Sequence, residues 1–337
     1  MSADVSTPSG PACGPVRHRS PGLDVTSFAG SVLREFHVTV RPLPNETPAD
    51  TLGRLAAVLR AQEALIVRQE VFGTLKAHRE VLQGMQKLLG EVNWPVTFVE
   101  GASCTAEPLA GLHVLAVAGT PVETIYWQGR PVGRAFRDRW VRHVLLGDIR
   151  PTDTDLARPA QARRGFEHLE SALGAAGLGF AQVARTWLFL DDILSWYGPL
   201  NTVRTEFFRE RGVFDRLVPA STGVSGRNLA GAAMVAGAWA AEPLNGAFTM
   251  REVKSPRQCA ATNYGSSFSR AVELGTPELR RLLISGTASI APDGQSVCPD
   301  DMEAQIDLTM DVVRAILVSR GMDFTDGSRV TAYFKRA

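Results

Sequence analysis

The stretches VLLG (Val144–Gly147) and LLISG (Leu282–Gly286) decide the fold, because the same series of elements is expected after each of them. Apolar residues at helical spacing come next in both copies, and a glycine closes both helices. A strand then follows, Val183–Leu190 in the first copy and Val330–Phe334 in the second. Equivalent residues lie 144 or 145 positions apart, so the second half of the chain is an internal duplication.

Strands and helices also alternate before this duplication. A strand is expected at His37–Val40, a helix over about 49–62, and a second strand over 64–72. Hairpins accompany the alternation, which favours an α+β fold with mixed sheets. The expected organisation is a disordered tail over 1–31, a degenerate β-α-β portion over 32–111, a first repeat unit over 112–250, and an incomplete second unit over 251–337.

Composition excludes several classes of protein. The 337 residues are 45% hydrophobic and 21% charged, enough to bury a core without disulfides or metals. The net charge of +1 gives no overall attraction for nucleic acid or an anionic membrane. No apolar run is long enough for a transmembrane helix, and the first residues have no signal-peptide pattern. Four scattered cysteines without a Cys-x-x-Cys pair favour the cytoplasm and argue against a metal site.

Histidine is confined to the first half of the chain. All six histidines occur at or before His168. A Ser-His hydrolase or a two-His iron centre in the second half is therefore excluded. Chemistry located there must use carboxylates, tyrosine, arginine or water.

Several motifs carry a family resemblance. The segments Thr186–Ile193 (TWLFLDDI), Asn201–Phe208 and Pro219–Thr222 (PAST) resemble the YjgF/Rid superfamily. The later segments Ser255–Gln258, Asn263–Ala271 and Ile284–Ile290 are similar to its chorismatase branch. This resemblance implies duplicated Rid-like units, and it covers the chain from about residue 112 to residue 335.

The resemblance also implies an activity. Chorismatases hydrolyse the enolpyruvyl ether of chorismate, which yields pyruvate and either a dihydroxycyclohexadiene carboxylate or 3-hydroxybenzoate for secondary metabolism. They use no metal and no organic cofactor. Because three Rid-like units in one chain can imitate a Rid trimer, we expect a monomer. Two alternatives stay open: a non-catalytic module that binds a small dicarboxylate, and a Rid-type imine deaminase.

Chorismate carries two carboxylates, which a near-neutral protein must meet with local cations. Arginine suits this task because its planar guanidinium binds a carboxylate through two parallel hydrogen bonds. The resemblance implies a cleft between units, and on that basis the expected substrate-binding residues are Tyr197, Arg204, Tyr264 and Arg270, with Arg257 as a further candidate. Each also has an ordinary structural interpretation: the arginines as surface ion-pair partners, and Tyr197 as a cap on the core.

Cleavage of a vinyl ether needs a proton on its terminal methylene carbon, and a carboxylic acid of raised pKa is the expected donor. The resemblance implies a glutamate on the last strand of the second repeat, a position that would lie beyond Ala337. The sequence is therefore expected to be truncated relative to its own repeat, to contain no catalytic residue, and to show weak or no turnover.

Overall fold

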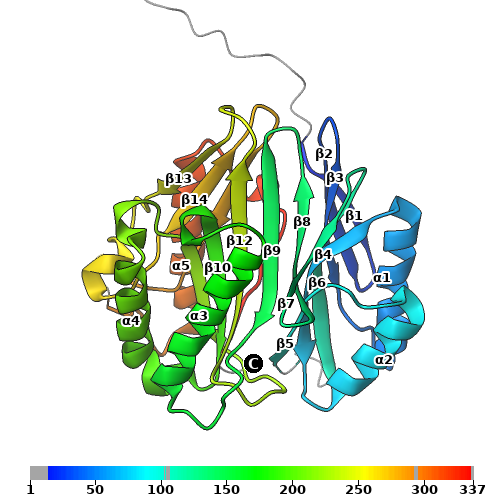
Figure 1. Cartoon of the computed structure of the whole chain (residues 1–337), viewed down its shortest axis with the longest axis horizontal. Helices are drawn as coiled ribbons and strands as arrows, with labels where there is room; N and C mark the ends of the chain where they lie inside the picture. Colours follow the sequence, from blue (N-terminus) through cyan, green and yellow to red (C-terminus); the bar gives the residue numbers. More distant parts are fainter. Residues whose placement is uncertain (1–13, 102, 104–106, 292–294, 335–337) are drawn as a thin grey trace, which may run out of the picture.

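Two six-stranded mixed sheets and one three-stranded sheet make up the protein, with the helices on their outer faces (Figure 1). The structure, a computed structural model, describes residues 14–334 apart from 102, 104–106 and 292–294. This arrangement confirms the expected α+β class. Among the described residues no helix is both long and apolar enough to cross a membrane.

The first unit contains a complete sheet with two helices. Its elements are β1 (Val16–Ser20), β2 (Leu23–Ala29), β3 (Arg34–Val40), α1 (Pro48–Gln62), β4 (Leu65–Gly73), α2 (Ala77–Leu89), β5 (Val96–Glu100) and β6 (Leu109–Ala118). Helix α1 begins after Thr47, whose hydroxyl accepts a hydrogen bond from the Asp50 amide at 3.2 Å. This cap satisfies an amide that has no partner within the helix.

The second unit repeats this order of elements. It consists of β7 (Glu123–Trp127), β8 (Arg130–Arg137), β9 (Val141–Ile149), α3 (Arg158–Ala175), β10 (Val183–Leu190), α4 (Ile193–Glu210), β11 (Ala220–Ser225) and β12 (Met234–Pro243). The strand orders are β1-β2-β3-β6-β4-β5 and β7-β8-β9-β12-β10-β11, which are the same topology. In each sheet only the pair β4–β5 or β10–β11 is parallel. The N-terminal portion is thus a full unit, and the expectation of a degenerate one is wrong.

Two boundaries also differ from expectation. Residues 16–29 form the hairpin of β1 and β2 rather than a disordered tail, while residues 1–13 lie outside the described residues. All five residues of β1 are exposed, so this edge strand shows no alternation of buried and polar side chains. Residues 112–118 belong to β6, which lies between β3 and β4, and not to the second unit.

The third unit matches the first half of the others. It contains β13 (Thr249–Val253), β14 (Ala271–Gly275), β15 (Arg280–Ile284) and α5 (Met302–Val318). A short 3-10 helix, Phe324–Asp326, follows α5 as Phe180–Gln182 follows α3.

The expected strand at Val330–Phe334 is wrong, because this segment pairs with no described strand. Its counterparts β4 and β10 each lie between two neighbouring strands, and the described part of the third unit contains no equivalent of either neighbour.

One hydrophobic core joins the three units. It contains Val67 and Leu115 from the first sheet, Trp187 and Trp239 from the second, and Leu283 from the third. All three sheets therefore turn one face toward a common centre.

Candidate active site

The second and third units join through main-chain hydrogen bonds. The Ser269 amide donates to the Pro219 carbonyl at 3.0 Å, and the Gly286 amide donates to the Ser221 carbonyl at 2.9 Å. The parallel bridge between Ala220 and Ser269 extends the edge of β11 into the third unit. This junction places helix α4 beside the loop that precedes β14.

Helix α4 carries two of the expected residues toward that loop. Its backbone is irregular at Trp196 (φ −144°, ψ 19°), and Pro199 follows three residues later. Proline is tolerated in the first turn of a helix because no hydrogen bond is required of its nitrogen there. The regular helix therefore starts near Tyr197, and Arg204 lies on the same face two turns further along.

Hydroxyl groups hold the loop against α4. The hydroxyls of Tyr197 and Ser266 share a hydrogen bond of 3.1 Å. Those of Thr205 and Ser267 share one of 2.7 Å. These two bonds fix the segment between Tyr264 and Arg270 relative to the helix.

The guanidinium groups of Arg204 and Arg270 meet at one aromatic ring. The Cζ atom of Arg204 lies 5.7 Å from the Phe268 ring centroid, and that of Arg270 lies 5.6 Å from the same centroid. The ring of Tyr264 lies 5.4 Å from the Arg270 Cζ atom. The structure thus brings together four of the five expected residues, from two different units.

Neither guanidinium is neutralised within the described part of the chain. Arg204 is 4% exposed and Arg270 5% exposed, yet no described carboxylate forms an ion pair with either. Arg204 Nη2 donates to Asn201 Oδ1 at 2.6 Å, and Arg270 Nε donates to the Cys259 carbonyl at 2.9 Å. Arg204 Nε and Arg270 Nη2 have no hydrogen-bond partner among the described groups. Buried donors of this kind are costly unless a ligand satisfies them.

The electrostatic environment is cationic with two phenols at its edge. Burial lowers the pKa of Arg204, and the nearby Tyr197 phenol opposes that shift. Burial raises the pKa of Tyr264, and Arg270 opposes the rise. An arginine side chain stays charged at neutral pH, so the site presents two cations and two neutral hydroxyl donors.

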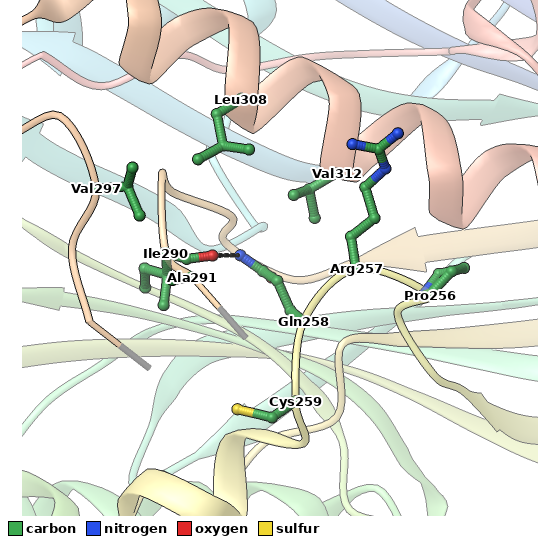
Figure 2. Close-up of a pocket in the computed structure, with 9 residues that line it drawn as sticks. All are labelled: Pro256, Arg257, Gln258, Cys259, Ile290, Ala291, Val297, Leu308 and Val312. Carbon is green, nitrogen blue, oxygen red and sulfur yellow. Dashed lines mark hydrogen bonds between the residues drawn. The ribbon is translucent and has the colours of Figure 1, made fainter. Parts of the chain in front are cut away.

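Arg257 lies apart from this group. It lines a cavity of about 610 Å³ between the segment Pro256–Cys259 and helix α5. Figure 2 shows its side chain beside Val312 of α5, with Gln258 hydrogen-bonded to the Ile290 carbonyl at 3.1 Å. The structure therefore does not bring Arg257 to the other four residues.

The corresponding position in the second unit cannot hold an arginine. The carbonyl of Arg270 accepts the Ser285 amide, and Gly133 has the matching pairing with Leu146 in β8 and β9. A Cβ atom on Gly133 would lie 2.8 Å from the Leu145 carbonyl oxygen. The two-arginine arrangement is therefore not repeated at the position of Gly133 in the second unit.

Sequence reasoning missed the residues that support the site. Phe268 lies close to both guanidinium groups, and Ser266, Ser267 and Thr205 fix the loop. The run of small residues between Tyr264 and Arg270 was the available signal, but it does not say which hydroxyl faces which helix.

Comparison with known proteins agrees with this architecture. No protein-family profile matches the sequence, and no curated protein matches it. Among solved structures the chain is similar to a chorismatase, with 18% identity over 86% of this chain and 79% of that one and a TM-score of 0.52. At this identity the likeness shows a shared fold, and the expected chorismatase-like architecture is confirmed.

Smaller structures match part of the chain. The YjgF gene product of E. coli has 21% identity over 35% of this chain and 97% of its own, with a TM-score of 0.29. A Mycobacterium tuberculosis member of the YjgF/YER057c/UK114 family has 22% identity over 36% and 98%, also with a TM-score of 0.29.

Proposed function

We propose that this protein binds chorismate between its second and third units, and that the bound ligand is the substrate of an enolpyruvyl-ether hydrolysis. The observation that carries the proposal is a pair of buried guanidinium groups that both lie close to the Phe268 ring and that no described carboxylate neutralises. The fold shared with a chorismatase supports it.

The chemistry of the ligand fits the site. Chorismate has one carboxylate on its ring and one on its enolpyruvyl side chain, and the site offers one arginine from each unit. Each buried arginine retains an unused donor for a carboxylate oxygen. The Phe268 ring provides an apolar surface beside the two charges, and the Tyr197 and Tyr264 hydroxyls can bind the ligand's polar groups.

Turnover requires one further group. A proton must reach the methylene carbon, water then adds to the oxocarbenium ion, and the hemiketal collapses to pyruvate and the ring alcohol. Within the described residues no carboxyl group hydrogen-bonds to any of the four site residues. We therefore propose that this chain binds chorismate but releases pyruvate slowly or not at all.

Two measurements test the proposal separately. Titration calorimetry with chorismate measures binding, and oxidation of NADH by added lactate dehydrogenase measures pyruvate release. Saturable binding without pyruvate supports both statements. Binding with turnover like that of a chorismatase would refute the statement about turnover, and an absence of saturable binding would refute the assignment of the ligand.

Imines derived from amino acids serve as the competing substrates. If the chain does not bind chorismate but accelerates imine hydrolysis, it is a Rid-type deaminase, and that function replaces the present proposal. Arg257→Gln is the matched control in the binding experiment, because Arg257 lies in the same unit but outside the site. Its affinity for chorismate should equal that of the unmodified chain.

A further inference from the structure

A second group of charges, two of them buried and two half-buried, lies where the three units meet. It consists of Arg68 and Glu70 on β4, Arg185 on β10, and Arg329 after α5, and we refer to it as the three-unit junction. None of these residues belongs to the site described above, and the proposed function does not use them.

The three arginines occupy equivalent positions in their units. Strands β4 and β10 each have a bulge against their partner strand, and the next paired residue is Arg68 in one and Arg185 in the other. Arg329 lies 144 positions after Arg185, the same offset that relates the 3-10 helices beginning at Phe180 and Phe324. One guanidinium from each unit therefore points to the common centre.

Their contacts place these groups close together. The Cζ atoms of Arg68 and Arg185 lie 3.2 and 4.9 Å from the centroid of the Trp187 ring. Arg68 Nη2 donates to Glu70 Oε1, and Arg329 Nη1 lies 3.4 Å from Glu70 Oε2. The single carboxylate is thus shared by two arginines.

Arg185 has no carboxylate partner among the described residues. It donates to the Ile284 carbonyl and, at 2.8 Å, to Thr222 Oγ1. Its Nε atom is buried and has no hydrogen-bond partner in the described structure. Three guanidinium groups and one carboxylate leave an excess of two positive charges at the junction.

Neighbouring titratable groups do not remove this excess. Burial, reinforced by Arg329, lowers the pKa of His113 to about 3, so this imidazole is neutral at pH 7. Burial also lowers the pKa of His37, and Glu35 is already paired with Arg281 at 2.7 and 2.8 Å. Burial raises the pKa of Tyr333 to about 12, which keeps the phenol neutral.

The surroundings disfavour the charged form of two of these arginines. Burial, together with Arg68 and Arg329, lowers the pKa of Arg185 to about 9. Burial lowers the pKa of Arg68 to about 10 despite the opposing effect of Glu70. On the third-unit side the Arg329 side chain is 18% exposed and Tyr333 is 41% exposed.

We propose that the three-unit junction is a binding site for a small oxyanion with two or more negative charges, held by Arg185 and Arg329. Guanidinium groups bind such oxyanions through paired, charge-assisted hydrogen bonds. A bound dianion would neutralise the excess charge and link the three units to one another.

Inorganic phosphate is the probe, titrated calorimetrically into the whole chain at constant ionic strength. Arg329→Gln removes one of the two proposed guanidinium ligands and should weaken phosphate binding about tenfold, the effect of losing one charge-assisted hydrogen bond. Glu70→Gln removes the competing carboxylate and should strengthen binding. Melting temperatures with and without phosphate provide a second readout, because a ligand that binds only the folded state raises stability.

Arg204→Gln separates this site from the one between α4 and the β14 loop. Phosphate binding that survives in Arg204→Gln but is weakened in Arg329→Gln belongs to the three-unit junction. An absence of saturable binding up to about 10 mM phosphate would overturn the proposal, since weaker affinities amount to less than about 3 kcal/mol. Equal affinities in the unmodified chain, Arg329→Gln and Glu70→Gln would overturn it as well.

Discussion

Replacing Arg204 with glutamine should separate ligand binding from stability. The side chain is 4% exposed, is charged, and has no carboxylate partner among the described residues. In a protein built around an ion pair, removal of one partner is strongly destabilising because the other charge remains buried. Here the substitution leaves no orphaned carboxylate and removes a desolvated cation.

The expected magnitudes follow from these contacts. The variant loses one hydrogen bond to Asn201 and the packing over Phe268. In return, it no longer carries the free-energy cost of burying a charged guanidinium. The free energy of unfolding should therefore change by no more than about 1 kcal/mol. Loss of a desolvated charge pair with a ligand carboxylate should cost about 2–4 kcal/mol, or about 30- to 1,000-fold in chorismate affinity.

Urea denaturation and chorismate titration measure the two effects on the same samples. Arg209→Gln is the control, because Arg209 lies on the same helix but is exposed. It should leave chorismate affinity unchanged. The reasoning is refuted if Arg204→Gln loses more than about 3 kcal/mol of stability while its chorismate affinity stays intact, since Arg204 would then be a structural residue.

Three further outcomes are expected. Tyr197→Phe should lower stability by about 1 kcal/mol and weaken chorismate binding, whereas Tyr126→Phe should do neither, as urea melts and titrations will show. The fold lowers the pKa of His113 to about 3, so below about pH 6.5 the unfolded chain takes up a proton that the native chain does not. The free energy of unfolding should therefore decrease as the pH is lowered, by up to about 1.4 kcal/mol per pH unit. His113→Gln should flatten that slope in denaturation measured from pH 7 to 4. Gly133→Ala should cost about 1–3 kcal/mol by overpacking against β9, while Gly174→Ala in α3, with open space around it, should raise the melting temperature.

Each of these outcomes has a contrary result. An unchanged stability of Tyr197→Phe would mean that the hydroxyl bond to Ser266 contributes nothing. Parallel pH curves for the unmodified chain and His113→Gln would mean that this histidine titrates normally in the fold. His18, exposed on β1, supplies the control substitution for that curve.

Much of the fold was predictable from periodicity. Helical spacing predicted α1 to within one residue and predicted a helix after each of VLLG and LLISG, where α3 and α5 lie, and apolar runs predicted β4 and β10. The first unit was underestimated because β1 is fully exposed, so its pattern contains no buried face. The order of the strands within a sheet is also invisible in a hydrophobic pattern, because pairing depends on contacts between distant segments.

The candidate site was also predictable only in part. Residue chemistry and resemblance together named Tyr197, Arg204, Tyr264 and Arg270, and the structure brings all four together between α4 and the loop before β14. Arg257 has the same chemistry, but a side chain's direction depends on how its segment packs. The three-unit junction escaped notice because its arginines are more than a hundred residues apart and become neighbours only through the packing of the three units.

The strand order described above has a consequence for how the protein is made. In both complete sheets the last strand synthesised, β6 or β12, occupies an interior place between two strands made earlier. In a nascent chain leaving the ribosome, the sheet of each unit therefore lacks an interior strand until the final segment of that unit emerges. Such long-range closure delays cooperative folding and leaves apolar surface open to nascent-chain chaperones during translation.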